Sequence, residues 1–243
     1  MKVVLVPGLW LTASSWDAVV PTLLAAGHRP EPLSMPGIGI PAAGSAQVGI
    51  ADWIAEVVRV VDRDDEPVVL VGHSGGANVV WGAADARPDR VARVVFVDAV
   101  PPLDGAGIWE FPIVDGVVPF PGWDSFDDEE VADLDAPTRQ RVEEQVTWIP
   151  ARIPTDPISL SDGRRHGIPI TVITCLMPSV DVRRTIDAGA PWVAELAAAD
   201  EVEIIDLPGG HWPQFAQPEA LGKALVAAIR SEPVPQPKPS PEE

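Results

Sequence analysis

Six short apolar runs along the chain predict its β-strands. Four of them lack polar alternation, which is typical of strands buried on both faces of a parallel sheet. A fifth run alternates more and is expected nearer an edge, and a sixth contains two prolines that make it a poor strand. The four are residues 3–6, 68–71, 94–97 and 170–173, the fifth is 202–207, and the sixth is about 29–35.

Segments with a helical period lie between these runs. In residues 45–63 the apolar side chains recur every three or four positions, which predicts a helix with one buried face. Further helices are expected over about 14–27, 75–86 and 218–230, where Pro218 suits a first helical position. Because strands and helices alternate, we predict an α/β fold with a mostly parallel sheet flanked by helices. A Rossmann-like sheet is the alternative, but no Gly-x-Gly-x-x-Gly follows the first run.

One long segment, residues 101–166, interrupts the alternation. It is rich in proline and has no long apolar run, and an excursion of this size inside a sheet domain is usually a lid or another functional insertion. We therefore expect a core built from residues 1–100 and 167–230, with 101–166 as its lid. Within the lid, residues 127–145 are charged and expected to be helical. Residues 231–243 carry five prolines and are expected to form an extended or disordered tail.

Composition narrows the possible partners and compartments. The chain has 243 residues, 46% of them hydrophobic, which suffices for one sizeable core. Its 36 acidic and 17 basic side chains give a net charge of −19, which argues against nucleic acid and anionic membranes as partners. The single cysteine, Cys175, excludes an intramolecular disulfide and a cysteine-rich metal site. The N-terminal apolar stretch is cut short at Pro7, and no run reaches the roughly 20 residues that span a bilayer, so we expect a cytoplasmic protein.

The chemistry-bearing motif is Gly72-His73-Ser74-Gly75-Gly76, which follows the second strong run and precedes a helical segment. This Gly-x-Ser-x-Gly pattern between a strand and a helix predicts a strained turn that exposes the serine hydroxyl. At a helix N-terminus, backbone N–H groups can stabilise a developing negative charge. Ser74 is therefore the candidate nucleophile, and the alternative is a connecting loop of small residues.

A serine hydroxyl is a weak nucleophile and needs a base within hydrogen-bond reach. Of the four histidines, His211 follows the last strand on a glycine-rich loop, at the edge where the carboxyl ends of parallel strands meet. Its late position agrees with the chain order serine, acid, histidine of such elbow motifs. His211 is the candidate base, and the alternative is a surface-loop histidine.

Taken together, these motifs resemble the α/β-hydrolase superfamily, above all its small serine esterases and hydroxynitrile-lyase-like members. The resemblance covers residues 1 to about 230 and implies an α/β-hydrolase fold that lacks the two first strands of the family. It is carried by the loop Val6-Pro7-Gly8-Leu9-Trp10, the elbow, Asp98 and Gly210-His211.

The resemblance also implies an oxyanion hole. In the family, one N–H comes from the residue after a His-Gly pair behind the first conserved strand, and the other from the residue after the nucleophile. The corresponding residues here are Leu9 and Gly75, with Pro7 in place of the histidine. Because the hole is made of backbone groups, we expect it to persist.

The acid that orients His211 has two candidates. It must accept a hydrogen bond from the far imidazole nitrogen. In most of the superfamily it follows the next-to-last strand, where the nearest carboxylate is Asp181, three residues late. A minority, including haloalkane dehalogenases, places it after the strand that follows the elbow, where Asp98 stands. A carboxylate closing such an apolar strand is costly to bury without a partner, so Asp98 is the first choice, with a turn cap as its alternative role.

These residues predict a serine hydrolase that cleaves carboxylic esters or lactones through an acyl-enzyme, without metal or organic cofactor. Its partner is expected to be a small to medium, neutral and largely apolar ester; the oligomeric state stays open. One alternative is an enzyme of the hydroxynitrile-lyase type, which is disfavoured because residues 101–166 contain no lysine. The other is a catalytically silent protein that binds a small molecule. The expected pocket residues are Trp10, His73, Trp109, Trp123, Trp148 and Trp212, some of which could instead hold the lid to the core.

About half of the negative charge falls in the proposed lid. Residues 101–150 contain twelve acidic and two basic side chains, a net charge of −10. Such a surface over the entrance would repel anionic substrates. The alternative is a solvated acidic face with no effect on selectivity.

Overall fold

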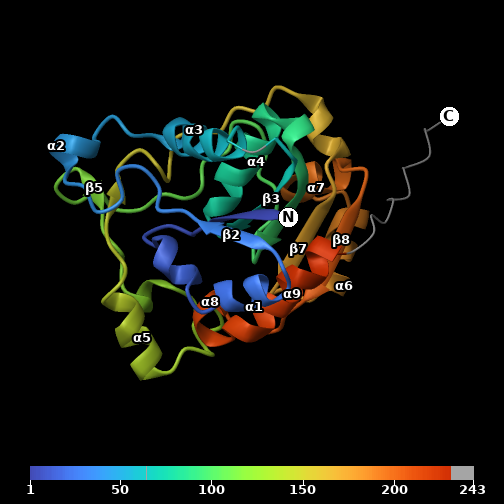
Figure 1. Cartoon of the computed structure of the whole chain (residues 1–243). Helices are drawn as coiled ribbons and strands as arrows, with labels where there is room; N and C mark the ends of the chain where they lie inside the picture. Colours follow the sequence, from blue (N-terminus) through green and yellow to red (C-terminus); the bar gives the residue numbers. More distant parts are fainter. Residues whose placement is uncertain (64, 231–243) are drawn as a thin grey trace.

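Six parallel strands form the central sheet of the computed structural model, which describes residues 1–63 and 65–230 (Figure 1). The predicted tail, 231–243, lies outside the described residues. The strand order is β2-β1-β3-β4-β7-β8, and every neighbouring pair is parallel. This confirms the predicted α/β class. The strands are β1 (Lys2–Val6), β2 (Arg29–Pro32), β3 (Val68–His73), β4 (Val91–Val97), β7 (Ile170–Thr174) and β8 (Val202–Asp206).

The burial of each strand explains its place in the sheet. Every residue of β1, β3 and β7 is buried, as the lack of polar alternation in their sequences predicts. Strand β8 alternates between buried and partly exposed positions and lies at one edge. Strand β2 contains two prolines and forms the other edge. Proline has no backbone N–H, but on the open side of an edge strand no hydrogen bond between strands is lost.

Helices cover both faces of this sheet. Helices α3 (Ile50–Val61) and α4 (Gly76–Ala86) pack on one face, and α1 (Val20–Ala25) and α9 (Pro218–Arg230) on the other. Alternate residues of one strand therefore enter different clusters, as Val4 packs with α3 and α4 whereas Leu5 packs with α1 and α9. The remaining α-helices are α2 (Ala42–Ser45), α5 (Ala136–Glu143), α6 (Ser179–Asp187), α7 (Ala194–Ala198) and α8 (Pro213–Ala216).

Three predicted helices are shorter in the structure. The helix expected over 45–63 is α3, which begins only after Gly49. The segment 14–27 divides into a 3₁₀ turn, η1 (Ala13–Trp16), and α1, because Pro21 has no N–H to continue a helix from residue 17. In 127–145 only α5 is helical. It begins after Asp135, whose carboxylate accepts the Thr138 N–H at 2.8 Å, with Pro137 in its first turn.

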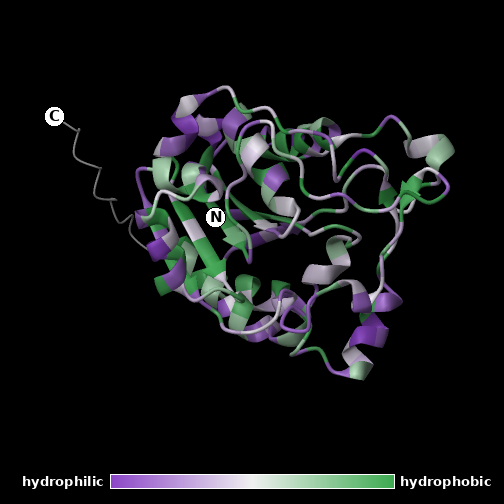
Figure 2. Ribbon diagram, turned by 180° about the vertical axis from the view of Figure 1, so that it is seen from behind, coloured by the Kyte–Doolittle hydropathy of each residue, from purple (hydrophilic) through white to green (hydrophobic). Residues whose placement is uncertain are grey.

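The segment 101–166, here called the insertion, follows β4 and contributes its own small elements. Strands β5 (Val117–Val118) and β6 (Ile149–Pro150) pair antiparallel, and the insertion also holds α5 and a 3₁₀ turn, η3 (Trp123–Ser125). Figure 1 shows α5 and β5 away from β7 and β8, and Figure 2 colours the central strands mainly as hydrophobic and α5 mainly as hydrophilic.

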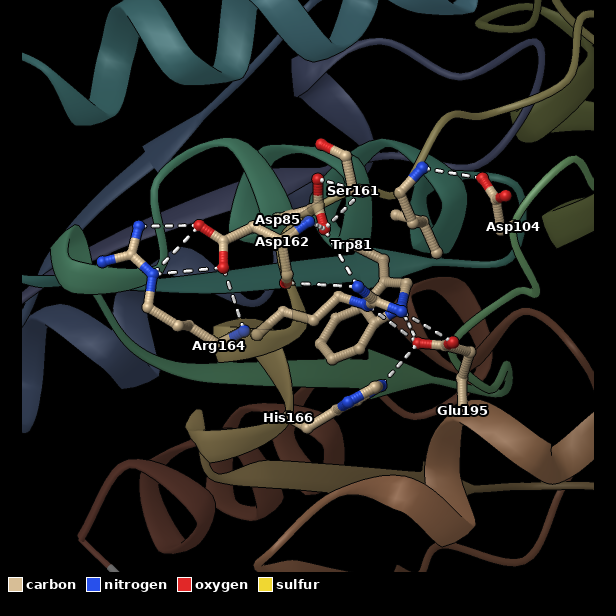
Figure 3. A network of polar contacts seen from close by, with 10 residues as sticks. Trp81, Asp85, Asp104, Ser161, Asp162, Arg164, His166 and Glu195 are labelled. Atoms are coloured by element: carbon tan, nitrogen blue, oxygen red, sulfur yellow. Dashed lines mark hydrogen bonds and ion pairs between the residues drawn. The ribbon is translucent and has the colours of Figure 1, made fainter.

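A buried polar network fastens the end of the insertion to the helix behind the elbow (Figure 3). Arg165, in the 3₁₀ turn η4 (Gly163–Gly167), bridges Asp85 of α4 at 3.1 Å and Glu195 of α7 at 2.8 Å. Trp81 and His166 also contact the Glu195 carboxylate, each at 3.1 Å. Burial alone raises the pKa of Glu195, but the hydrogen bonds from Arg165, His166 and Trp81 outweigh it and hold that pKa below its usual value. Glu195 therefore stays ionised at neutral pH.

Replacing Arg165 with methionine is expected to lower the free energy of unfolding by about 3 kcal/mol, because two buried carboxylates lose their cation. The matched control is Arg164→Met, since the Arg164 side chain is 62% exposed and its ion pairs with Asp89 and Asp162 lie at the surface. Urea unfolding at pH 7 measures both variants. Equal effects of the two substitutions would show that the buried network does not stabilise the fold.

Candidate active site

The turn between β3 and α4 carries Ser74 in a strained conformation. Its φ of 51° lies in the left-handed region that non-glycine residues rarely adopt. The flanking glycines permit close packing: a Cβ added at Gly72 would lie 2.6 Å from the carbonyl oxygen of Gly76, and one at Gly76 would lie 2.7 Å from the Pro7 carbonyl oxygen. Strand, helix and the loop after β1 thus meet where only a hydrogen atom fits.

His211 lies on the loop after β8, with its ring paired to Asp98. His211 Nδ1 is 2.6 Å from Asp98 Oδ2. The other carboxylate oxygen of Asp98 accepts the backbone N–H groups of Cys175 at 2.9 Å and Leu176 at 3.2 Å. Asp98 directly follows β4 and has a φ of 46°, a second strained residue at this edge of the sheet. Both carboxylate oxygens are therefore held, and His211 Nε2 is left for the cavity.

The surroundings of Asp98 keep it ionised. Its side chain is 8% exposed, and this burial by itself raises its pKa. The hydrogen bond and the charge of His211 lower the pKa, as do the N–H groups of Cys175 and Leu176, and together they bring it below the usual value. An ionised Asp98 favours the imidazolium that a general base forms.

Asp181, the second candidate for the acid, lies elsewhere. It belongs to the first turn of α6, has an exposed side chain, and pairs with Arg184 one helical turn later. The structure therefore brings Asp98 to His211 and leaves Asp181 at the surface.

Ser74 and His211 line one cavity of about 620 Å³. Within the described residues, the Ser74 hydroxyl makes no hydrogen bond, and none joins it to His211. Such contacts are often long in proteins without substrate and tighten in the reacting complex.

Two backbone N–H groups next to Ser74 are available to a ligand. Those of Leu9 and Gly75 have no hydrogen-bond partner in the part of the chain that the structure describes. The two residues are neighbours in space, since a Cβ added at Gly75 would lie 3.0 Å from Leu9 Cγ. Leu9 follows Gly8 on the loop after β1 and lines the cavity. Their placement suits a pair of donors for an oxyanion, as the resemblance implied.

Three of the expected tryptophans line the cavity, together with phenylalanines of the insertion. Trp109 is 70% exposed, whereas Trp10 and Trp212 are buried. Trp123 and Trp148, also expected in the pocket, do not line this cavity. Trp123 packs edge-on against Trp212 at 5.4 Å and donates to the Arg139 carbonyl, and Trp148 donates to the Ile40 carbonyl at 3.0 Å. The full lining is Gly8, Leu9, Trp10, His73, Ser74, Ile108, Trp109, Phe111, Ser125, Phe126, Asp127, Glu129, Glu130, Leu176, His211 and Trp212.

His73, expected in the pocket, lines the cavity but chiefly holds the backbone of the candidate base. Its Nε2 is 2.7 Å from the His211 carbonyl oxygen, and Gln214 Nε2 is 3.3 Å from its Nδ1. Burial, followed by the nearby charge of His211, lowers the pKa of His73 to about 3. The ring is therefore neutral, with its proton on Nε2 to donate to that carbonyl.

Some residues of the cavity carried no signal in the sequence analysis. Leu176 lies two residues after the end of β7, and Ile108 lies in the loop before β5. The position of Leu176, three residues after the predicted strand 170–173, is a signal that could have placed it at this edge of the sheet. Ile108 carries no such signal, because it lies in irregular backbone of the insertion.

Comparison with known proteins places this chain in a family. The profile of the Alpha/beta hydrolase family matches residues 3–224, and the chain belongs to that family. The chain is 39% identical over 106 residues to Esterase PIR7B of Oryza sativa subsp. japonica, a match that covers 42% of this chain and only 40% of that esterase. It is 30% identical over 200 residues to Lipase LipV of Mycobacterium tuberculosis, covering 70% of each chain.

The structural comparison agrees on the fold. An extracellular alpha/beta-hydrolase from a Paenibacillus species superposes with a TM-score of 0.76 at 22% identity, covering 95% of this chain and 100% of that one. The predicted α/β-hydrolase fold is thereby confirmed. Within the described residues, no helix is both long and apolar enough to cross a membrane. The same residues hold no group of three or more His, Cys, Asp or Glu placed to bind a metal ion.

Proposed function

We propose that this α/β hydrolase is a serine hydrolase of carboxylic esters or lactones. The observation that carries the proposal is that His211, whose Nδ1 pairs with Asp98 at 2.6 Å, lines the same cavity as Ser74 on its strained turn. The names of the relatives, an esterase and a lipase, support the same bond type.

In this mechanism His211 Nε2 takes the proton of the Ser74 hydroxyl as its oxygen attacks the substrate carbonyl. The Leu9 and Gly75 N–H groups hold the oxyanion of the tetrahedral intermediate. When the intermediate collapses, the C–O bond to the alcohol breaks and His211 donates its proton to the leaving oxygen. The acyl-enzyme is then attacked by water, which His211 deprotonates, and the acid leaves as Ser74 regains its proton.

The lining of the cavity supports small to medium, neutral and largely apolar substrates. Five aromatic side chains contribute to it, and its volume of about 620 Å³ falls in the usual range of small-molecule sites. The lining contains three carboxylates and, among the described residues, no lysine or arginine. A lyase of the hydroxynitrile-lyase type would need a cation to hold cyanide. Because the described lining offers no lysine or arginine, it favours ester hydrolysis.

A direct experiment on the unmodified protein tests the proposal. The protein is incubated with a fluorophosphonate and, separately, with short-chain p-nitrophenyl esters and lactones. Covalent labelling at Ser74 and turnover of at least one ester are expected. A folded protein that is neither labelled nor active would exclude the proposed function.

Anionic esters are expected to be poorer substrates than neutral ones, because the carboxylates of Asp127, Glu129 and Glu130 line the cavity. The test compares a dialkyl ester of a dicarboxylic acid with its monoester, which keeps one free carboxylate. At low ionic strength kcat/KM should be about tenfold lower for the monoester, and the ratio should shrink as salt screens the charges. In Glu129→Gln the kcat/KM values of the dialkyl ester and the monoester should lie closer together than in wild type. Salt-independent discrimination would show that the acidic residues do not set selectivity.

A further inference from the structure

The loop that carries His211 is tied to the insertion as well as to the elbow. The His211 N–H donates to the Glu130 carbonyl at 2.8 Å, and the preceding Gly210 N–H donates to Asp133 Oδ2 at 2.8 Å. The third tie is the bond from His73 to the His211 carbonyl. Two of these three hydrogen bonds are made with one acidic stretch of the insertion, residues 127–134.

The glycine pair of this loop is what lets the acidic stretch come so close. A Cβ added at Gly209 would lie 2.7 Å from Asp133 Oδ2, and one at Gly210 would overlap the Asp133 carboxylate and the Glu130 carbonyl. Any side chain at Gly210 would therefore push this stretch away from the loop. The Gly-Gly-His sequence thus serves the docking of the insertion.

The acidic stretch is itself held in place. The Glu130 N–H donates to the Asp127 carbonyl at 2.9 Å, which closes a turn. The guanidinium of Arg139 donates to the carbonyls of Val131 at 2.8 Å and Leu134 at 2.9 Å. The buried side chains of these two residues pack in one cluster with Trp212, the residue after the candidate base. Residues 127–134 are therefore held in one conformation by hydrogen bonds and packing.

We propose that Asp133 is a positioning residue for His211, acting through the Gly210 N–H. This inference rests on the proposed function, because it assigns a role within that reaction. Asp133 does not line the cavity, so it acts on the base and not on substrate binding. A hydrogen bond from a backbone N–H to a carboxylate is charge-assisted and directional. A general base must keep its geometry to within about 0.5 Å, and a loop fixed at residues 210 and 211 limits the movement of the His211 ring.

The test compares three variants of the whole protein. Asp133→Ala removes the acceptor, Asp133→Asn keeps an amide oxygen in its place, and Asp128→Ala removes the same charge from a neighbouring exposed residue that makes no hydrogen bond among the described residues. Active sites are counted by phosphonate titration, so that unfolded protein does not enter kcat. Asp133→Ala is expected to lower kcat about tenfold with KM within twofold of wild type. Asp133→Asn and Asp128→Ala should stay within threefold of wild type.

A second readout does not depend on turnover. The proton between His211 Nδ1 and Asp98 should give a low-field ¹H NMR signal in the wild type, and this signal should broaden or vanish in Asp133→Ala but persist in Asp128→Ala. An unchanged kcat and an unchanged signal in Asp133→Ala would overturn the positioning role. Equal losses in Asp133→Ala and Asp128→Ala would assign the effect to charge and overturn it as well. A wild type without esterase activity would instead refute the proposed function, while the NMR comparison would still decide the role of Asp133.

Discussion

Ser74→Ala is expected to lower kcat by about five to six orders of magnitude, to the residual rate that the oxyanion hole and substrate binding supply. Without the Ser74 oxygen no acyl-enzyme forms, whereas the pair of His211 and Asp98 is left intact. The measurement is ester turnover at saturating substrate, with fluorophosphonate labelling of the same preparation. Labelling should disappear together with activity.

The control for this variant is its stability. The Ser74 hydroxyl has no hydrogen-bond partner among the described residues, and alanine keeps the Cβ that strains the turn at a φ of 51°. Ser74→Ala should therefore unfold at nearly the same urea concentration as wild type. Ser74→Gly relieves the strain and should be more stable by about 1 kcal/mol while equally inactive. An alanine variant that keeps a hundredth of the wild-type activity would contradict the assignment of Ser74 as nucleophile.

Asp98→Asn is expected to lower kcat by about four orders of magnitude. An asparagine can present its amide N–H to His211 Nδ1, which stabilises the tautomer that cannot accept the serine proton. The control is Asp181→Asn, which should stay within twofold of wild type because Asp181 pairs only with Arg184 at the surface of α6. If Asp181→Asn were the inactive variant and Asp98→Asn retained activity, the acid assigned here would be wrong.

The stability of the same Asp98 variant should depend on pH. Because the folded pKa of Asp98 is lowered, its carboxylate stabilises the fold at pH values above the unfolded pKa of about 4, and this contribution is lost as the pH falls through the folded pKa. The difference in unfolding free energy between wild type and Asp98→Asn should therefore shrink below about pH 4. Urea unfolding between pH 3 and pH 7 measures it.

The positions of the strands along the chain and the place of the elbow were predictable from the sequence because both rest on local pattern. Apolar runs without alternation mark strands covered on both faces, and the motif around Ser74 needs only the strand before it and the helix after it. Helix ends were less predictable. The helix expected over 14–27 is interrupted near Pro21, and the one expected over 127–145 begins only after Asp135, so a proline or a cap outweighed the charge pattern.

The sequence favoured Asp98 as the acid but left Asp181 as an alternative, because the choice depends on which loops meet at His211. Asp98 and Asp181 each follow a strand whose end lies at the same edge of the sheet. The structure separates them because Asp98, with its positive φ, turns toward the His211 loop, whereas Asp181 is carried away on α6. The lining of the cavity could not be predicted for the same reason. Trp123 packs against Trp212 and does not line the cavity, and this contact joins residues far apart in the chain.

The sequence alone predicts the fold family, the candidate nucleophile and base, and the acidic character of the insertion. These depend on periodicity, on a short motif and on composition, which tertiary contacts do not alter. The folded chain shows which carboxylate pairs with His211 and which aromatic side chains line the cavity. It also shows that the acidic insertion holds the histidine loop through Glu130 and Asp133. Each of these is a contact between distant segments, and its geometry is set by how the loops after the parallel strands converge at one edge of the sheet.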